Sequence, residues 1–337
     1  MALFIAKRLG AALLLVVGTI LVAFVLTAVL PGDAATARLG EQAAANPEIV
    51  EAMRRQMGLD RPLYEQFFIY LGGLFRGDLG DSVQTTRPVL TDLMLFGPAS
   101  AELALSATLI AVVVGGGLGI VAALRANTAI DNVLRAFSLG GVSIPIFWFA
   151  LIATSVFATR LQWFPSSGRL DAGEIPPPRV TGFYTIDSLL AGDLPLFFQA
   201  VDHLILPAIV LSAPMVGLLM RFTRASVLDV LGQEYIRAAE AKGLSPRSVV
   251  FGHVLRGALV PVITVVGTAF ASLLAGTVLV EQIFAWPGIG SYAYRAASTL
   301  DLSAIVGVTI FVALIYIFVN LITDILYGII DPRIRRA

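Results

Sequence analysis

Long apolar segments alternate with polar segments along this chain of 337 residues. Six segments are predominantly apolar over about 20 residues, the length that an α-helix needs to cross the hydrocarbon core of a bilayer. The pattern therefore predicts six membrane-spanning helices. The predicted spans are Leu9–Leu30, Pro98–Leu124, Val133–Thr159, Leu204–Met220, Leu259–Val280 and Leu302–Ile330.

The composition agrees with a membrane protein. The chain is 57% hydrophobic and 14% charged, with a mean hydropathy of +0.86, whereas soluble domains carry about 25% charged residues. The first apolar segment is longer than the roughly 7–15 apolar residues of a signal peptide, so we interpret it as a retained span.

Several kinds of chemistry are excluded by residue types that are missing or rare. The chain has no cysteine, which excludes disulfides and thiolate metal ligands. Its two histidines, His203 and His253, are far apart in sequence, and we expect both at the membrane interfaces and no metal site. The two lysines, Lys7 and Lys242, do not follow glycine, so the chain lacks a Walker A phosphate loop. We expect neither a nucleotide site of this kind nor enzyme activity in this chain, and if ATP drives the protein, another subunit supplies the site.

Charged residues are distributed asymmetrically between the two sets of connecting segments. One set, which includes residues 221–256 and both termini, holds 13 basic and 5 acidic residues, while the other holds 10 basic and 16 acidic residues in about twice the length. Because basic residues favour the cytoplasmic side, the first set, including the N- and C-termini, is predicted to be cytoplasmic.

A short polar helix is predicted between two of the apolar segments, at Gln233–Lys242. Gly232 and Gly243 bracket it, and glycine suits the left-handed residue that follows a helix. Ser245 and Pro246 then resemble the start of a second helix, with serine capping free amides and proline in the first turn. In a membrane protein, such an element on the cytoplasmic side favours contact with another protein.

This stretch resembles the cytoplasmic EAA loop of type I ABC importer permeases, which docks on the ATPase subunits. The family pattern is Glu-Ala-Ala, three residues, glycine and a later Leu-Pro. Here the chain reads Arg237-Ala238-Ala239, then Gly243, then Leu259-Val260-Pro261. The arginine in place of glutamate and the long distance from Gly243 to Pro261 both match the dipeptide/oligopeptide/nickel branch.

Motifs along nearly the whole chain are similar to those of that branch. They are Leu30-Pro31-Gly32-Asp33, Met57-Gly58-Leu59-Asp60-Arg61-Pro62-Leu63, Arg76-Gly77-Asp78-Leu79-Gly80, Ser143-Ile144-Pro145-Ile146-Phe147-Trp148, the segment from Val280 to Gly290, and Asp331-Pro332-Arg333. Their order and spacing carry the resemblance more than any single motif does.

The resemblance implies an all-α membrane protein with the six-helix type I permease fold and an extended outer segment after the first helix. It divides the chain into residues 1–97 (first span and outer helical segment), 98–330 (permease core with the coupling loop 221–256) and 331–337 (cytoplasmic tail). It also implies a bacterial or archaeal cytoplasmic membrane. The implied partners are a second homologous permease, two ATPase subunits that bind ATP and Mg, an extracytoplasmic substrate-binding protein and the lipid bilayer, without nucleic acid.

The resemblance assigns ATPase coupling to the polar helix and its glycine turn. The residues are Glu234, Tyr235, Arg237, Ala238, Ala239, Ala241, Lys242, Gly243 and Leu244. The spacing places Tyr235, Ala239 and Lys242 on one helix face. Arg237 and Glu240 pair either with the ATPase or with each other. The alternative is a solvated helical hairpin without a partner.

Further candidate residues lie at the outer side and inside the spans. The resemblance assigns the outer mouth or gate to Glu281, Phe284, Trp286, Pro287 and Gly288, while a tryptophan anchored among lipid headgroups is the alternative. Asp324 is an intramembrane polar candidate, because buried acids in spans are costly, although a bond to a neighbouring helix also explains it.

Three other sequence features call for a structural interpretation. Glu102 is interpreted as a carboxylate near an outer helix start, where the helix dipole favours it. Gly115 and Gly119 predict close helix packing, because they are four residues apart on one face. The aromatic residues of the segment Asp60–Phe75 suit either the outer membrane interface or core packing.

The combined interpretation is a permease subunit of a binding-protein-dependent importer for oligopeptides or dipeptides. Nickel, glutathione and oligosaccharides are the alternative substrates in the same machinery. A secondary transporter driven by an ion gradient and a membrane scaffold are the rival classes. The secondary transporter is disfavoured because the chain shows no internal repeat and has few charged residues within its spans.

Overall fold

The computed structural model describes residues 2–29, 46–56 and 60–330, and these residues are mainly helical. The α-helices are α1 (Ala2–Val29), α3 (Pro47–Gln56), α4 (Leu63–Phe75), α5 (Val89–Ile110), α6 (Gly117–Leu124), α7 (Ala129–Ser143), α8 (Ile146–Ala153), α9 (Tyr184–Leu190), α10 (Leu194–Leu231), α11 (Glu234–Ala241), α12 (Pro246–Val249), α13 (Leu255–Gly276), α14 (Val278–Ile283), α15 (Ile289–Ser298) and α16 (Leu302–Ile330). Three π-helical segments are η1 (Ala111–Gly116), η2 (Thr154–Arg160) and η3 (Val250–Val254).

Apolar helices lie where the sequence predicts spans. Three stretches are long and apolar enough to cross a membrane: Val89–Leu124, Leu194–Leu231 and Leu302–Thr323. Two more consist of helix pairs joined at a bend: Ala129–Ser143 with Ile146–Arg160, and Pro246–Leu259 with Pro261–Phe270. Leu9–Val25 is a shorter apolar helix. The described residues thus hold three spans, or up to five if each bent pair is one span, whereas the sequence predicts six.

Two helices begin earlier than the apolar pattern predicts. The predicted span from Pro98 starts at Val89 in the structure, and the one from Leu204 starts at Leu194. The added turns are stabilised by burial and capping, since Val89 is fully buried and Asp193 accepts a hydrogen bond from the amide of Leu196. The length of the apolar segment therefore underestimates the length of both helices.

The third predicted span is broken between α7 and α8, whose axes differ by 101°. Ile144 leaves the helical conformation with ψ at 125°. The cause is Pro145, which lacks an N–H and disfavours helical backbone at the residue before it.

The described chain divides into two compact units. One comprises Pro98–Ser291 with the described residues of Met1–Ile5 and Phe318–Ala337, and the other comprises Ala6–Gly97 with Tyr292–Ile317. In the second unit, Phe67 and Tyr70 of α4 pack against a cluster that includes Ile20 and Ile310. Tyr64 and Phe68 are 65% and 66% exposed. Both predicted roles of this aromatic segment are therefore compatible with its geometry.

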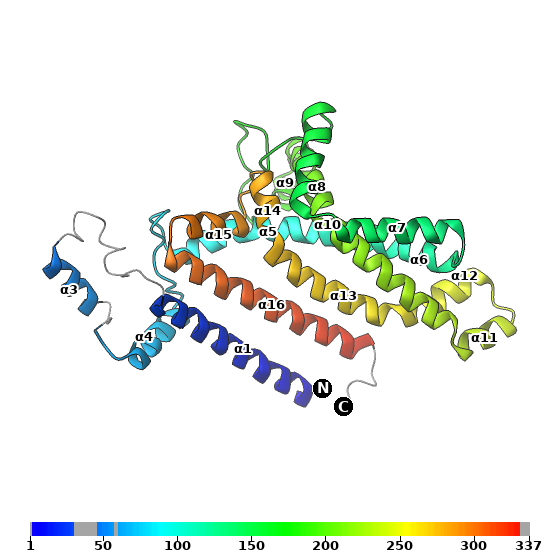
Figure 1. Ribbon diagram of the computed structural model, residues 1–337, viewed down its shortest axis with the longest axis horizontal. Coiled ribbons are helices and arrows are strands. Elements are labelled where there is room, and N and C mark those ends of the chain that lie inside the picture. Colours follow the sequence, from blue (N-terminus) through cyan, green and yellow to red (C-terminus); the bar gives the residue numbers. More distant parts are fainter. Residues whose placement is uncertain (1, 30–45, 57–59, 331–337) are drawn as a thin grey trace. The chain divides into compact units, whose positions relative to one another are not determined.

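The first unit is organised around α10, which contacts η1, α6, α7 and α13 (Figure 1). Glycine permits the closest of these approaches. A Cβ on Gly115 would lie 2.8 Å from the carbonyl oxygen of Val216, and one on Gly119 would lie 2.7 Å from that of Met220. These distances confirm the close packing predicted from the two glycines.

We predict that Gly119→Ala destabilises the folded protein by about 1–3 kcal/mol, the usual cost of overpacking. The added methyl group would meet both Met220 and Thr223 of α10. The measurement is the midpoint of thermal unfolding of the purified protein in detergent. Gly116→Ala is the matched control, because no heavy atom lies within 4 Å of its Cβ position. Equal unfolding midpoints for the two variants would contradict the packing explanation.

Candidate functional site: an exposed helix and a buried corner

The predicted polar helix is present as α11, and its boundaries agree with the sequence. It spans Glu234–Ala241, and Gly243 follows with φ at +79°, in the left-handed region that glycine tolerates. Ser245 caps α12 by accepting a hydrogen bond from the amide of Ser248. The sequence signals thus account for the end of α11 and the start of α12, whereas Gln233 at the start of α11 makes no side-chain capping bond.

One face of α11 is buried in its own unit. Ile236 and Ala239 are 1% and 8% exposed, and they join a cluster that contains Val227, Val230 and Val254. Sequence reasoning missed Ile236, although Ile236 and Ala239 have the i, i+3 spacing of an apolar helix face. Ala239 points into this cluster, whereas Tyr235, which was expected on the same face, is 50% exposed.

The opposite face of α11 and the turn after it are exposed. The exposed residues are Glu234, Tyr235, Arg237, Ala238, Glu240, Ala241, Lys242, Gly243 and Leu244. Among the described ion pairs none joins Arg237 to Glu240, which were left open as a pair above. The face therefore presents two acidic and two basic side chains that alternate along the helix.

The predicted outer-mouth residues form a packed corner. Glu281, Phe284 and Trp286 are each at most 1% exposed, and of the five predicted residues only Pro287 is exposed. The indole N–H of Trp286 donates to the carbonyl oxygen of Ala99 at 2.9 Å. Trp286 is thus an internal packing residue, and its burial argues against the headgroup-anchor alternative.

The carboxylate of Glu281 is satisfied by donors from two elements. The hydroxyl of Ser100 donates to it at 2.5 Å and the amide of Ser291 at 2.7 Å. The Ser291 amide belongs to the first turn of α15, where free N–H groups favour a negative charge. A Cβ on Gly288 would lie 2.4 Å from this carboxylate, so the corner needs glycine there.

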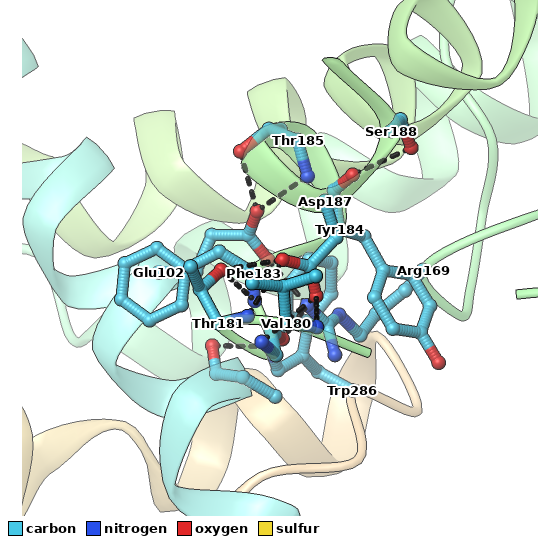
Figure 2. Close-up of polar contacts among 12 residues, drawn as sticks. Glu102, Arg169, Val180, Thr181, Phe183, Tyr184, Thr185, Asp187, Ser188 and Trp286 are labelled. Atoms are coloured by element: carbon cyan, nitrogen blue, oxygen red, sulfur yellow. Dashed lines mark hydrogen bonds and ion pairs between the residues drawn. The ribbon is translucent and has the colours of Figure 1, made fainter. Parts of the chain in front are cut away.

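A buried ion pair lies beside this corner, as Figure 2 shows. Arg169 donates to Glu102 at 2.5 Å, with side chains 6% and 4% exposed. The guanidinium also lies 3.5 Å from the centre of the Tyr184 ring and 5.5 Å from that of Trp286. Glu102 accepts further bonds from the amide and hydroxyl of Thr185. These contacts fasten residues 161–193, which lie between η2 and α10 and are termed the outer loop after their predicted side of the membrane, to α5.

The interpretation of Glu102 as a helix-start residue is wrong. Helix α5 begins at Val89, so Glu102 lies well inside it. Its charge is compensated by Arg169 and not by a helix dipole. Sequence reasoning had no signal for this partner, because Arg169 lies 67 residues away in an irregular loop.

The outer loop has a second carboxylate centre at Asp187. Its oxygens accept hydrogen bonds from the amides of Thr181 at 2.7 Å, Gly182 at 2.8 Å and Val180 at 3.3 Å (Figure 2). Burial alone would raise the pKa of Asp187, but these hydrogen bonds outweigh burial and hold the pKa below its ordinary value. The carboxylate thereby orders the segment before α9.

The remaining candidates are not part of the corner. Asp324 falls within α16, and its side chain lies outside the described residues. His203 is buried, with Nδ1 at 3.1 Å from the carbonyl oxygens of Ser167 and Gly168, so it fastens the loop to α10. His253 lies exposed in η3. Among the residues that the structure describes, no group of three or more metal-ligating side chains is placed to hold a metal ion.

Comparisons with known proteins identify the chain's relatives. The family model for the binding-protein-dependent transport system inner membrane component matches residues 115–336, and that for the N-terminal part of such membrane components matches residues 1–92. The chain is 44% identical over 332 residues to the di/tripeptide transport system permease protein DppB of Pseudomonas aeruginosa, covering 98% of each chain. It is 43% identical over 331 residues to the probable D,D-dipeptide transport system permease protein DdpB of Escherichia coli, covering 98% of this chain and 97% of the relative.

A solved structure shares the fold. A chain of the MetNI methionine ABC transporter, described as inward facing, superposes with a TM-score of 0.50 at 16% identity. The match covers 70% of this chain and 96% of the transporter chain. At this identity the likeness concerns the fold alone.

We predict that the order of the outer loop depends on the charge of Asp187. Because its folded pKa is depressed, its contribution to stability is present above the unfolded pKa of about 3.9 and is lost as pH falls through the folded pKa. Hydrogen exchange of the Val180, Thr181 and Gly182 amides, corrected for intrinsic rates, should increase in acid.

The variant Asp187→Asn should raise this exchange at neutral pH and remove most of its acid dependence. Glu174→Gln is the control, because Glu174 is an exposed carboxylate of the same loop. Unchanged exchange in the asparagine variant would show that other groups hold the loop.

Proposed function

Because this chain belongs to the family of binding-protein-dependent transport system inner membrane components, we propose that it forms half of the translocation pathway of an ATP-driven peptide importer. As a member of this family it is a multi-pass transport subunit of the bacterial inner membrane and works with other ABC components. The second half of the pathway is proposed to be a homologous permease, and an extracytoplasmic binding protein delivers the substrate.

The observation that carries the docking proposal is the two-sided character of α11. Its buried residues, Ile236 and Ala239, fix the helix to the permease, while its charged side chains remain exposed. We propose that Glu234, Arg237, Glu240 and Lys242 contact the ATPase, and that Tyr235, Ala238 and Ala241 shape the same surface. In this assignment Ala239 supports the docking face from beneath.

The proposed cycle is the one that membership of this family implies. ATP and Mg are bound by two partner ATPases, whose closure on ATP moves the docking helices and opens the pathway outward. Peptide then passes from the binding protein into the pathway and leaves inward after hydrolysis. The buried corner around Glu281 is proposed as the rigid outer rim, with Pro287 as its exposed contact, since the other outer-mouth residues are covered.

Peptides are the proposed substrates because the relatives at 43% and 44% identity carry dipeptide and di/tripeptide transport names. The charge asymmetry of the connecting segments supports cytoplasmic termini and a cytoplasmic α11.

The orientation and the docking can be tested together, because the chain contains no cysteine. We expect a single Lys242→Cys variant to react with an impermeant maleimide in inside-out vesicles and not in right-side-out vesicles. Stripping peripheral subunits with urea should increase its labelling rate. Arg125→Cys, an exposed cytoplasmic residue outside α11, should react from the same side without that increase.

Labelling of Lys242→Cys from the outside would contradict the orientation. A rate that stays the same after stripping would contradict docking on α11.

Uptake should depend on the exposed charges of α11. We expect Arg237→Glu to lower ATP-dependent dipeptide uptake by at least about tenfold, because reversing an interfacial charge costs more than 1.4 kcal/mol. Uptake of a labelled dipeptide is measured in proteoliposomes that contain the whole complex and binding protein. Arg125→Glu is the charge-matched control and should retain uptake. Transport of nickel, glutathione or an oligosaccharide without dipeptide uptake would contradict the substrate assignment.

A further inference from the structure

Helices α7 and α10 are antiparallel, and residue contacts join them at three levels along their length. Asp131 pairs with Arg224, and two turns further along α7 the hydroxyl of Ser138 donates to the carbonyl oxygen of Gly217 at 2.7 Å. At the third level, a Cβ on Gly141 would lie 3.2 Å from the carbonyl oxygen of Ala213. Contacts at matched intervals fix how the helices lie against each other.

The Asp131–Arg224 pair has the geometry that best specifies a register. Nε and Nη2 of Arg224 donate to the two carboxylate oxygens of Asp131, each at 2.7 Å. Two parallel bonds between planar groups fix orientation as well as distance. Asp131 also accepts from the amide of Asn127 at 3.0 Å, which fastens the turn before α7. The Asp131 side chain is 1% exposed, whereas that of Arg224 is 21% exposed.

The Asp131–Arg224 pair lies near the C-terminal end of α10, which packs against α11. Arg224 is two turns before the end of α10, and Val227 and Val230 on those turns belong to the cluster that buries Ile236 and Ala239. A displacement of α11 therefore acts first on the end of α10 that carries Arg224.

On the other side, α7 continues toward the buried corner. After the bend at Pro145, α8 places Ala150 and Ala153 in the same cluster as Phe284 and Trp286. Helix α7 thus connects the cytoplasmic ion pair, through one bend, to the core beneath the outer corner.

We propose that Asp131 and Arg224 are positioning residues that lock α7 to α10, so that a displacement of α11 moves both helices together. The proposal rests on the docking function proposed for α11. Neither residue touches substrate or nucleotide in this assignment. The Ser138 bond and the glycine contacts keep the helices packed without the pair. Loss of the pair therefore affects the transmission of movement more than assembly.

The test uses the full complex in proteoliposomes, with ATP hydrolysis and dipeptide uptake measured in the same vesicles. Asp131→Asn and Arg224→Gln should assemble and hydrolyse ATP, while the amount of peptide taken up per ATP falls by about tenfold, within the range for coupling residues. The amount of peptide taken up per ATP should fall similarly in Arg224→Lys, because lysine keeps the charge and lacks the planar two-point contact.

Two comparisons separate positioning from a general loss of fold. Asp229→Asn, an exposed carboxylate on the same helix α10, should leave uptake per ATP unchanged. The double variant Asp131→Arg with Arg224→Asp exchanges the two residues and restores the two-point contact. It should therefore recover part of the peptide uptake per ATP.

Two outcomes would overturn the positioning role, and a third would overturn the docking function on which it rests. Normal uptake per ATP in Asp131→Asn contradicts transmission through the pair. The pair is merely structural if the variants have a lower unfolding midpoint and lose ATPase subunits, while the complexes that remain take up a normal amount of peptide per ATP. Absence of ATPase subunits from the native complex instead contradicts the proposed docking function, so the two failures are distinguishable.

Discussion

The close approach of helices to α10 is the constraint on which most of the first unit depends. Lipid tails are as apolar as leucine side chains, so helices in a bilayer associate through packing and hydrogen bonds and not through hydrophobic burial. Gly115 and Gly119 on one neighbour and Gly217 on α10 itself leave backbone carbonyl groups where a methyl group would otherwise lie. Helices α7 and α8, on either side of the bend at Pro145, and the buried face of α11 all pack against α10.

Local signals in the sequence predict local features well. The glycine after α11, the serine cap of α12 and the close-packing glycines were predicted correctly, because each depends on a few neighbouring residues. The apolar pattern locates the spans but underestimates α5 and α10, since their first turns are stabilised by tertiary contacts.

The buried polar contacts were not predictable in the same way. Glu102 and Arg169 come from a helix and a loop without a regular pattern, and nothing in either neighbourhood indicates the other. The burial of Ile236 was not predicted, because charged residues surround it in the sequence. The docking face itself remains a prediction, and the structure adds which of its side chains are exposed.

The buried corner around Glu281 also has a consequence for how the chain is made. Ser100 and its partner Glu281 are 181 residues apart, and Ala99 and Trp286 are 187 residues apart. During synthesis from the N-terminus, the hydroxyl and carbonyl on α5 enter the membrane long before their partners exist. The native contacts of this corner therefore form only after α14 and Trp286 have been made. Completion of the corner is a late event in the biogenesis of this protein, and a chain truncated before Glu281 would leave these groups without their native partners.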